Sequence, residues 1–478
     1  MTDTFPLMIP GGAVAGTREV RAAFDGALIA LVETGGEEAV ETALASAYAK
    51  FRNRDSWLSP AERIGILERT ANIIESRAEE LALAAATEGG KPLVDSRIEI
   101  GRGIDGIRNC IEVIRTEGGK EIPMGLNAGS AGRMAFTRKE PIGVVVAVSA
   151  FNHPFNLVIH QVMPAVATGC PVIVKPAAAT PLSGLRIVSI LREAGLPDEW
   201  CQAIVTDNSG TSTKLATDPR VSFFAFIGSP GVGWMLRSKL SPGTRCALEH
   251  GGAAPVIVAE DVDLDVAIPL LLKGGFYHAG QVCVSVQRIF AHSSIAKELA
   301  TRLAEGAAQL KIGDPTSADT EVGPLISTKE VERVDEWVKE AVEGGAECLT
   351  GGSKISDTCY ECTVLLNPSQ EATVSQKEIF GPVVCVYSCE DIDSSIELAN
   401  SLPFSFQSAV FTQNIDTALR VYRRIRASAV MVNDHTAFRV DWAPFAGLDV
   451  SGHGVGGIPY TIEELQIDKM IVIKSIEL

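Results

Sequence analysis

Three residues in the middle of the chain are of types that can do chemistry on another molecule. Cys283 lies in "GQVC", between a turn of small residues and the apolar run "IFAH", Glu249 lies in "LEHGG", and Asn152 follows the apolar run "GVVVAV". A partly accessible thiolate is a nucleophile, a carboxylate whose pKa is raised by burial can act as a general base, and an amide at a strand end can donate hydrogen bonds into a cleft. Each residue also has a structural alternative: cysteine is often simply buried, asparagine favours turns, and a glutamate can end a helix before a Gly-Gly turn.

Two further segments contain groups that suit a ribose or a phosphate. Lys175 ends the apolar run "PVIVK", where its ammonium group can hydrogen-bond a ligand or extend into solvent. In "FIGSPGVG", Gly228 and Ser229 connect a strand to a helix that begins near Gly233, and the N–H groups of a helix N-terminus suit a phosphate. The segment lacks the spacing G-x-G-x-x-G, so by itself it is a weak indication of a dinucleotide site.

The elements that must position these residues alternate between short β-branched runs and helical segments. In the middle of the chain this alternation predicts a parallel sheet covered by helices on both faces. A second alternation after Cys283 predicts a second α/β domain, with the cysteine near the junction. In the first third, a capping-box pattern at Ser59 and Glu62 begins one long helix, which the Gly89-Gly90 pair ends.

Composition narrows the class of protein. The 478 residues exceed one typical hydrophobic core, and a formal net charge of −17 disfavours a nucleic-acid or anionic-membrane partner. No apolar run is long enough to span a bilayer, and the N-terminus does not resemble a secretory signal. Ten unevenly spaced cysteines predict a cytoplasmic protein, not a disulfide framework. The "CYEC" pair, Cys359 and Cys362, has no second ligand pair, so a chance spacing or a surface loop is favoured over a metal site.

Two segments predict association between copies of the chain. The stretch "MGLNAGSAGRMAFTRKEP" has the pattern of a hairpin that leaves the first domain, and "DKMIVIKSIEL" at the C-terminus has the pattern of a strand without a neighbour. A strand with unpaired edges needs a partner. We therefore expect a homodimer or homotetramer formed by strand pairing.

The segments named above, in this order, resemble one family. "FIGSPGVG", "LEHGG" and "GQVC", followed by "KEIFGPV" and "PFAGLDVSGHG", are similar to the signature segments of the NAD(P)-dependent aldehyde dehydrogenases, and the resemblance extends over nearly the whole chain. It implies an aldehyde dehydrogenase-like fold of two α/β domains with a small β oligomerisation module. Residues 1–120 and 141–249 would form the dinucleotide-binding domain, 250–445 the catalytic domain, and 121–140 with 458–478 the oligomerisation hairpin and strand.

The resemblance also implies a catalytic role for each of the three residues. Cys283 would attack the aldehyde carbon, and the side-chain amide of Asn152 with the Cys283 backbone N–H would hold the oxyanion of the thiohemiacetal. Hydride transfer to the nicotinamide would leave a thioester, and Glu249 would activate the water that hydrolyses it. A CoA-acylating enzyme is the nearest alternative, but that branch lacks the glutamate. A non-catalytic structural protein or a dinucleotide sensor of the same fold is a further alternative, although it need not retain all three residues.

The cofactor residues follow from the same resemblance. Lys175 would contact the adenosine ribose, Gly228, Ser229 and Gly233 the diphosphate, and Glu378 the nicotinamide ribose with Phe380 beside it. A carboxylate commonly found three residues after the lysine is replaced by Ala178, which removes a charge that would repel a 2′-phosphate. NAD or NADP is therefore expected as the cofactor, with NAD slightly favoured and no metal required.

Four residues are candidates for the substrate site. His153 follows Asn152, Arg439 and Phe445 lie in "NDHTAFRVDWAPF", and Arg108 lies in a helical segment expected to face the same funnel. Two arginines and a histidine would suit a small aldehyde with an anionic or hydroxyl group, as in the lactaldehyde and phosphonoacetaldehyde branch that these segments resemble. The alternative is that both arginines form structural ion pairs.

Overall fold

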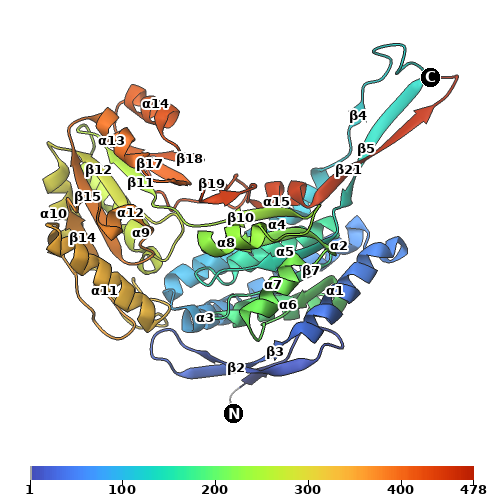
Figure 1. The fold of residues 1–478 in the computed structure, drawn as a ribbon, viewed down its shortest axis with the longest axis horizontal. Coiled ribbons are helices and arrows are strands. Elements are labelled where there is room, and N and C mark those ends of the chain that lie inside the picture. Colours follow the sequence, from blue (N-terminus) through green and yellow to red (C-terminus); the bar gives the residue numbers. More distant parts are fainter. Residues whose placement is uncertain (1–2) are drawn as a thin grey trace.

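The computed structural model describes residues 3–478, which form two α/β lobes and a long arm that projects from the first lobe (Figure 1). The first lobe is built from the N-terminal half of the chain together with α15 (Ile458–Glu464) near the C-terminus. The second lobe contains most residues after Glu249. The chain passes from the first lobe to the second just after Glu249, whereas Cys283 lies within the second lobe, between the elements Leu264–Phe276 and Arg288–His292.

The first lobe contains a six-stranded sheet. In spatial order its strands are β20 (Gly452–His453), β10 (Arg245–Glu249), β9 (Val221–Ile227), β6 (Val144–Val148), β7 (Val172–Lys175) and β8 (Cys201–Ala203). All are parallel except β20, which pairs antiparallel with β10. The chain order reverses at β6, because β7 and β8 lie on one side and β9 and β10 on the other. Ligands of such sheets bind at the carboxyl ends of the strands beside this switch point.

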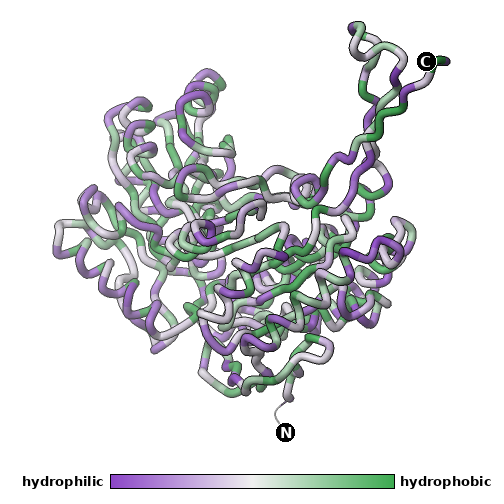
Figure 2. The backbone as a smooth tube through the Cα atoms, turned by 45° about the vertical axis from the view of Figure 1, so that its right-hand side comes forward, coloured by the Kyte–Doolittle hydropathy of each residue, from purple (hydrophilic) through white to green (hydrophobic). Residues whose placement is uncertain are grey.

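Helices cover both faces of this sheet, as the continuous apolar strands predict. Val145 and Ala147 of β6 pack into one core, whereas Val144, Val146 and Val148 pack into the other. In Figure 2 the hydrophobic stretches of the chain, in green, lie mostly inside the lobe, and the hydrophilic ones, in purple, lie mostly at its outside. The helices of this lobe are α1 (Glu37–Arg52), α2 (Pro60–Ser76), α3 (Ala78–Gly89), α4 (Leu93–Thr116), α5 (Asn156–Thr168), α6 (Pro181–Glu193), α7 (Ser209–Thr217), α8 (Pro230–Arg237) and α15.

The helix predicted between Ser59 and Gly89 is two helices. The capping box at Ser59 and Glu62 is present, and α3 ends at Gly90, whose φ of 78° suits glycine. Between α2 and α3, however, Arg77 has φ −114° and ψ 15°, outside the helical region. No glycine or proline marks this break, so the sequence pattern did not reveal it.

The second lobe contains a seven-stranded sheet. Its strands, in spatial order, are β13 (Glu347–Thr350), β14 (Thr363–Leu366), β15 (Val383–Cys389), β12 (Arg288–His292), β11 (Pro255–Val258), β17 (Gln407–Phe411) and β18 (Ala429–Val432). Only β13 is antiparallel to its neighbour. The helices are α9 (Leu264–Phe276), α10 (Ala296–Ala307), α11 (Thr328–Glu343), α12 (Thr373–Gln376), α13 (Ile392–Ala399) and α14 (Ile415–Arg424). The "CYEC" cysteines Cys359 and Cys362 are buried in this lobe, so the surface-loop interpretation was wrong.

A small N-terminal sheet lies against the first lobe. It consists of β1 (Asp3–Phe5), β3 (Leu28–Gly35) and β2 (Val14–Arg21), in that spatial order. It is joined to the larger sheet through Gly35, whose N–H donates to the carbonyl of Val205. Arg18 of β2 is thereby brought close to the carboxyl end of β7.

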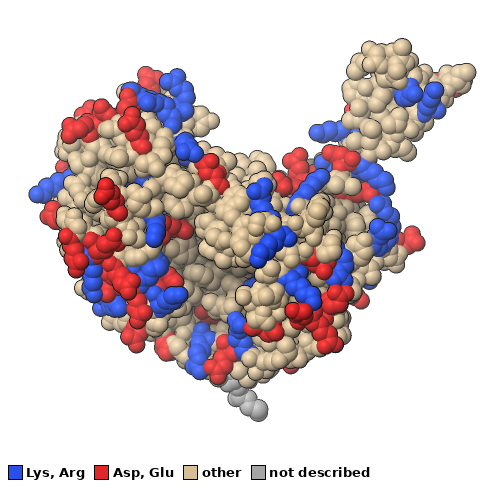
Figure 3. All heavy atoms as spheres, in the orientation of Figure 1, with Lys and Arg blue, Asp and Glu red and all other residues tan. Residues whose placement is uncertain are grey.

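The arm contains β4 (Glu121–Ile122), β5 (Arg133–Pro141) and β21 (Gln466–Lys474). Strand β21 pairs antiparallel with β5 along its whole length, from Gln466 opposite Pro141 to Lys474 opposite Arg133. The residues of α15, in contrast, pack into the core of the first lobe. The projecting strand therefore begins at Gln466, eight residues after the predicted boundary at 458. Charged side chains of both signs are mixed over the two lobes, whereas the face of the arm seen in Figure 3 is mostly uncharged, with a few Lys and Arg side chains.

Candidate active site

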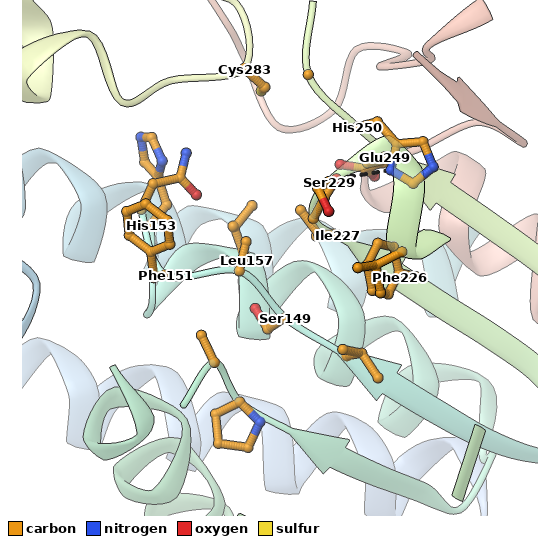
Figure 4. Close-up of a pocket in the computed structure, with 18 of the residues that line it drawn as sticks. Ser149, Phe151, His153, Leu157, Phe226, Ile227, Ser229, Glu249, His250 and Cys283 are labelled. Atoms are coloured by element: carbon orange, nitrogen blue, oxygen red, sulfur yellow. Dashed lines mark hydrogen bonds between the residues drawn. The ribbon is translucent and has the colours of Figure 1, made fainter. Parts of the chain in front are cut away.

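A cavity of about 750 Å³ lies between the carboxyl ends of the first sheet and the second lobe. It brings together twelve of the fourteen residues proposed from the sequence, and several of them surround it in Figure 4. Those twelve are Asn152, His153, Lys175, Ala178, Gly228, Ser229, Glu249, Cys283, Glu378, Phe380, Arg439 and Phe445. The strand register explains this convergence: Val148 pairs with Lys175 on one side and with Phe226 on the other, and Glu249 pairs with Ile227.

Cys283 lies in a short turn between α9 and β12, and its side chain points into the cavity (Figure 4). The turn is unusual, because the preceding residues His278 and Ala279 have φ values of 50° and 53°. A hydrogen bond from Val286 N to Gly274 O, 2.9 Å long, fixes its far end. The pKa of Cys283 is raised to about 12, chiefly by burial; the carboxylates Glu378 and Glu249 contribute to the increase, and Arg439 opposes it. The thiol is therefore protonated at neutral pH and needs a base before it can act as a nucleophile.

Other parts of the protein hold both the side chain and the backbone carbonyl of Asn152. Its Nδ2 donates to the carbonyl of Gln281 at 2.9 Å, which ties the loop after β6 to the turn that carries Cys283. Behind it, the buried ammonium of Lys91 contacts the Asn152 carbonyl at 3.4 Å and forms an ion pair with Glu99. The other oxygen of Glu99 accepts from the N–H groups of Phe155 and Asn156. An interior ion pair thus fixes the loop from Asn152 to the start of α5.

Two carboxyl groups face the cavity near Cys283. Burial raises the pKa of Glu249, with the charge of Arg439 acting in the opposite direction. Burial also raises the pKa of Glu378 to about 8, although the N–H of Gly252 donates to its Oε1 at 3.2 Å. Glu378 lies directly against the backbone of Gly251, where a Cβ atom would overlap its carboxylate. A base with a raised pKa beside a nucleophile suits general base catalysis.

The residues near the switch point fit a dinucleotide. Ser229 is the N-cap of α8, yet its hydroxyl makes no capping hydrogen bond and can reach a ligand. At Gly228 an added Cβ would lie 2.8 Å from the Phe226 ring, which is too close. The position therefore requires glycine, and no side chain covers its backbone at the cavity. Lys175 Nζ contacts only the carbonyl of Pro176, at 3.1 Å, within residues 3–478. A cavity of this size with free donors beside a helix N-terminus accommodates a diphosphate and its riboses.

Gly233 is not at the cavity surface. A Cβ atom at this position would overlap the imidazole of His250, whose Nδ1 is 2.9 Å from the carbonyl of Gly228. Gly233 is therefore required for the packing of α8 against β10. Its effect on the cavity is indirect, through the position of His250 beside Gly228.

A cluster of charged residues closes the other side of the cavity. Arg102 donates from Nε and Nη2 to the two oxygens of Asp441, at 3.0 and 2.6 Å. His160 lies between Asp441, 2.7 Å from its Nε2, and Arg439, 3.4 Å from its Nδ1. Burial lowers the pKa of His160 to about 4, so it is neutral. Arg439 stacks on Phe445, with its guanidinium carbon 3.5 Å from the ring centroid.

Arg439 lacks a close anionic partner. Its nearest carboxylate oxygen, on Asp441, is 3.8 Å from Nε, and that buried Nε has no hydrogen-bond acceptor. His153 lines the same region, 3.1 Å from the Tyr277 hydroxyl through Nε2, and burial holds its pKa well below the usual value. Within residues 3–478, the one ion pair of Arg439 is thus this long contact with Asp441, whose two oxygens Arg102 already binds, so the arginine charge near Cys283 is only partly compensated.

Arg108 is not part of this cluster. It lies on the outer face of α4, half-exposed, and pairs with Glu75 at 2.8 Å. For Arg108, the structure therefore shows the alternative: the residue forms a structural ion pair. The arginine of α4 that does line the cavity is Arg102.

Four lining or supporting residues were not found from the sequence: Arg102, His160, Asp441 and Arg18. Asp441 is 281 residues from its partner His160, so no local pattern links them. "RGIDGIR" contains both Arg102 and Arg108, and a helical projection would have shown that they cannot both face the cavity. Within residues 3–478 no group of three or more His, Cys, Asp or Glu side chains is placed to hold a metal ion. No helix of this part of the chain is long and apolar enough to cross a membrane.

The fold and the cavity together define a class. A doubly wound sheet with free donors at its switch point, facing a thiol and two carboxyl groups across a cleft, is the equipment of a dinucleotide-dependent oxidoreductase that uses a covalent cysteine step. The aldehyde dehydrogenase family model matches residues 12–471, and the chain belongs to this family.

Individual relatives agree with this assignment. A 3-sulfolactaldehyde dehydrogenase of Priestia aryabhattai is 38% identical over 442 residues, 92% of each chain. A lactaldehyde dehydrogenase of Methanocaldococcus jannaschii is 32% identical over 93% of this chain and 94% of its own. The crystal structure of aldehyde dehydrogenase 21 from Physcomitrella patens with the product succinate superposes with a TM-score of 0.95 at 32% identity, covering 100% of this chain and 99% of that one. Further solved relatives, at 30% identity, are described as NAD-dependent or are complexed with NADP.

The comparisons confirm the predicted family, the aldehyde dehydrogenase fold and a nicotinamide dinucleotide as cofactor. The enzyme oxidises an aldehyde with NAD or NADP. The lactaldehyde-related branch suggested by the sequence is represented among the relatives.

Proposed function

We propose that this enzyme oxidises a short aldehyde that carries an anionic group, with Arg439 as the partner of that group. One observation carries the proposal: Arg439 lines the cavity that contains Cys283 and Glu249, and its buried Nε has no acceptor. Arg102 does not compete for the anion, because Asp441 already occupies it. Two relatives are named for small aldehydes with a sulfonate or hydroxyl group, which supports a substrate of this size.

The covalent step belongs to Cys283. As the sulfur attacks the carbonyl carbon, its proton passes to a carboxylate, for which Glu249 is suited because burial has raised its pKa. The oxyanion of the thiohemiacetal is held by the second N–H of Asn152 Nδ2 and by the N–H of Cys283, which donates to no backbone carbonyl within residues 3–478. Because Lys91 and Glu99 hold the Asn152 loop, these donors are in place before the substrate arrives.

The oxidation and hydrolysis steps use the two sides of the cavity. NAD or NADP, when bound, would supply the acceptor for the hydride that leaves the former aldehyde carbon. Gly228, Ser229 and Lys175 would hold the dinucleotide on the side of the first sheet, while Glu378 and Phe380 would position its nicotinamide ribose. After Glu249 has released the thiol proton to solvent, it takes a proton from water while the water oxygen attacks the thioester carbon. The C–S bond then breaks, the carboxylic acid leaves, and the sulfur of Cys283 regains a proton from Glu249. Hydrolysis is favoured over transfer to CoA because Glu249 is present at the cavity.

The experiment is a substrate panel with purified enzyme. Short aldehydes with a carboxylate, sulfonate, phosphonate or hydroxyl group are compared with neutral aliphatic and aromatic aldehydes, separately with NAD and NADP, and coenzyme reduction is measured. A higher kcat/KM for the anionic members supports the proposal. Equal or better turnover of neutral aldehydes would contradict the role of Arg439 and leave that of Cys283 standing. The Cys283→Ala variant is the control for turnover that does not depend on the thiol.

The arm supports assembly into a homo-oligomer, either a dimer or a tetramer. Apolar side chains on β5 and β21 are exposed although the strands are well formed, among them Phe136, Met470, Ile471 and Val472, which are between 42% and 54% accessible. The arm carries few charges in Figure 3. A second copy that covers these strands would remove the apolar surface from water. Sedimentation velocity of the enzyme and of an Ile471→Asp variant tests this, since the substitution should yield smaller species.

A cytoplasmic location remains a prediction from the cysteine content.

A further inference from the structure

The end of the cavity formed by β7, β2 and the start of α7 is positively charged. Among its lining residues within 3–478, the only acidic ones are Glu249 and Glu378, and both act on the Cys283 thiol. Lys175 and Arg18 line the opposite end. This part of the cavity therefore contains two cations and no carboxylate.

Arg18 is an arginine without a hydrogen-bond or ion-pair partner in the described part of the chain. It lies on β2, opposite Val32 of β3, and is half-buried. Within residues 3–478 its guanidinium forms no ion pair and no hydrogen bond, whereas Arg21 of the same strand binds Glu19 and the carbonyl of Gly26. A partly desolvated guanidinium with five unused donors is suited to a planar or tetrahedral oxyanion.

Neighbouring groups complete a site for an anion next to a ribose. Thr206 and Ser212 line the cavity and hydrogen-bond each other at 2.6 Å, and Ser209 begins α7 beside them. Ala178, three residues after Lys175, also lines the cavity and is a small apolar residue that neither repels an anion nor bonds ribose hydroxyls. Burial lowers the pKa of Lys175 to about 8, with the charge of Arg18 acting in the same direction. An anion between Lys175 and Arg18 would relieve this repulsion.

We infer that Arg18 binds the 2′-phosphate of NADP and that the enzyme prefers NADP to NAD. The inference rests on the proposed function, because it places the adenosine ribose beside Lys175. A 2′-phosphate has a charge near −2 at neutral pH, and it would receive charge-assisted hydrogen bonds from Arg18 and Lys175. The ribose of NAD has no group that can use Arg18. This inference would reverse the slight preference for NAD expected from the sequence, where no pattern brought β2 to this site.

Equilibrium binding tests the inference without turnover. Isothermal titration calorimetry of the wild-type enzyme, Arg18→Leu and Arg21→Leu is carried out with NAD, NADP, adenosine 2′,5′-bisphosphate and adenosine 5′-monophosphate. Arg21→Leu is the matched control. Arg21 lies on the same strand as Arg18, but it does not line the cavity. We expect the wild type to bind NADP about tenfold or more tightly than NAD. Arg18→Leu should weaken NADP and the bisphosphate about ten- to a hundredfold and change NAD less than about threefold, as for loss of hydrogen bonds to a charged group.

The possible results separate this inference from the proposed function. If the wild type binds NAD at least as tightly as NADP, or if Arg18→Leu weakens both coenzymes equally or neither, the role of Arg18 is wrong while the dinucleotide site stands. If neither coenzyme binds the wild type, the proposed dinucleotide site itself is wrong. Ala178→Glu provides an independent check that leaves β2 unchanged: it should weaken NADP more than NAD, and an equal effect on both would contradict a phosphate at this position.

Discussion

Arg102 binds both carboxylate oxygens of Asp441, and this pairing leaves Arg439, which is 3.8 Å from Asp441, as the least compensated cation of the substrate side of the cavity. His160 adds no charge, because its pKa of about 4 keeps it neutral. The stacking of Arg439 on Phe445 fixes the guanidinium plane without using its donors. A cation that is held in place and not neutralised is what discrimination between anionic and neutral substrates requires.

Replacement of Arg439 by leucine should therefore affect anionic aldehydes selectively. We expect KM for a sulfonated or carboxylated aldehyde to rise about ten- to a hundredfold, in line with about 1.5–3 kcal/mol for a hydrogen bond to a charged group. The KM for a neutral aldehyde of the same length should change little. Steady-state kinetics with a matched pair of aldehydes measures both effects.

Arg108→Leu is the control for this prediction. It removes an arginine of the first lobe that pairs with Glu75 at the surface and does not line the cavity. Both substrates should retain their KM values in this variant. A similar rise for both aldehydes in Arg439→Leu would mean that the arginine supports the cavity structurally and does not recognise the anion.

The thiol of Cys283 should react slowly with alkylating agents in the enzyme without ligands. Its pKa of about 12 means that the thiolate fraction, and with it the rate of alkylation by iodoacetamide, should increase about tenfold for each pH unit between pH 7 and 10. Mass spectrometry of the peptide that contains Cys283 gives the rate, and Cys283→Ala supplies the background from the other cysteines. An alkylation rate that levels off below pH 8 would contradict this prediction, because the pKa of Cys283 would then be far lower than its burial implies.

The site was predictable where its residues follow strands that are apolar on both faces. Glu249 and Lys175 end such strands, and Asn152 follows one closely, so that parallel pairing alone places them at one edge of the sheet. Cys283 precedes the apolar run of β12, which the sequence also shows. The two α/β lobes followed from the same alternation, and the family resemblance then supplied roles that the pattern could not.

The remaining features depend on packing between distant segments. Arg102 and Arg108 are six residues apart on α4, which places them about 120° apart around the helix axis, so that only one can face the cavity. The sequence suggested the wrong one because the surrounding glycines obscure the apolar face. Arg18 could not be found either, since its strand is more than 150 residues away in the chain from Lys175 and reaches the cavity only through the small N-terminal sheet.

Replacement of Glu249 by glutamine should separate oxidation from hydrolysis. Without the base, the thioester of Cys283 accumulates, so rapid mixing should show a burst of about one reduced coenzyme per site followed by a steady rate about 10²–10⁴-fold below wild type. In the wild type, activity should fall as pH decreases through the pKa of Glu249, which burial raises above the ordinary value of 4.5. The glutamine variant should lack this acid limb. A variant without a burst and with an unchanged pH profile would exclude Glu249 as the base for hydrolysis.

Removal of one partner of the buried Lys91–Glu99 ion pair should reduce both stability and turnover. In Glu99→Gln the ammonium of Lys91 stays in the interior without its counter-charge, which costs about 3–5 kcal/mol, and the N–H groups of Phe155 and Asn156 lose a charged acceptor. The loop that carries Asn152 is then less well fixed, so kcat should fall while KM changes little. Thermal unfolding and steady-state kinetics measure the two effects.

The double variant Lys91→Met with Glu99→Gln should recover much of the stability but not kcat. No charge is then left unpaired, whereas the support of the Asn152 carbonyl is still missing. Glu79→Gln, which breaks an exposed ion pair with Arg97, serves as the control and should change neither quantity appreciably. Full recovery of kcat in the double variant would show that the pair affects folding alone and does not position Asn152.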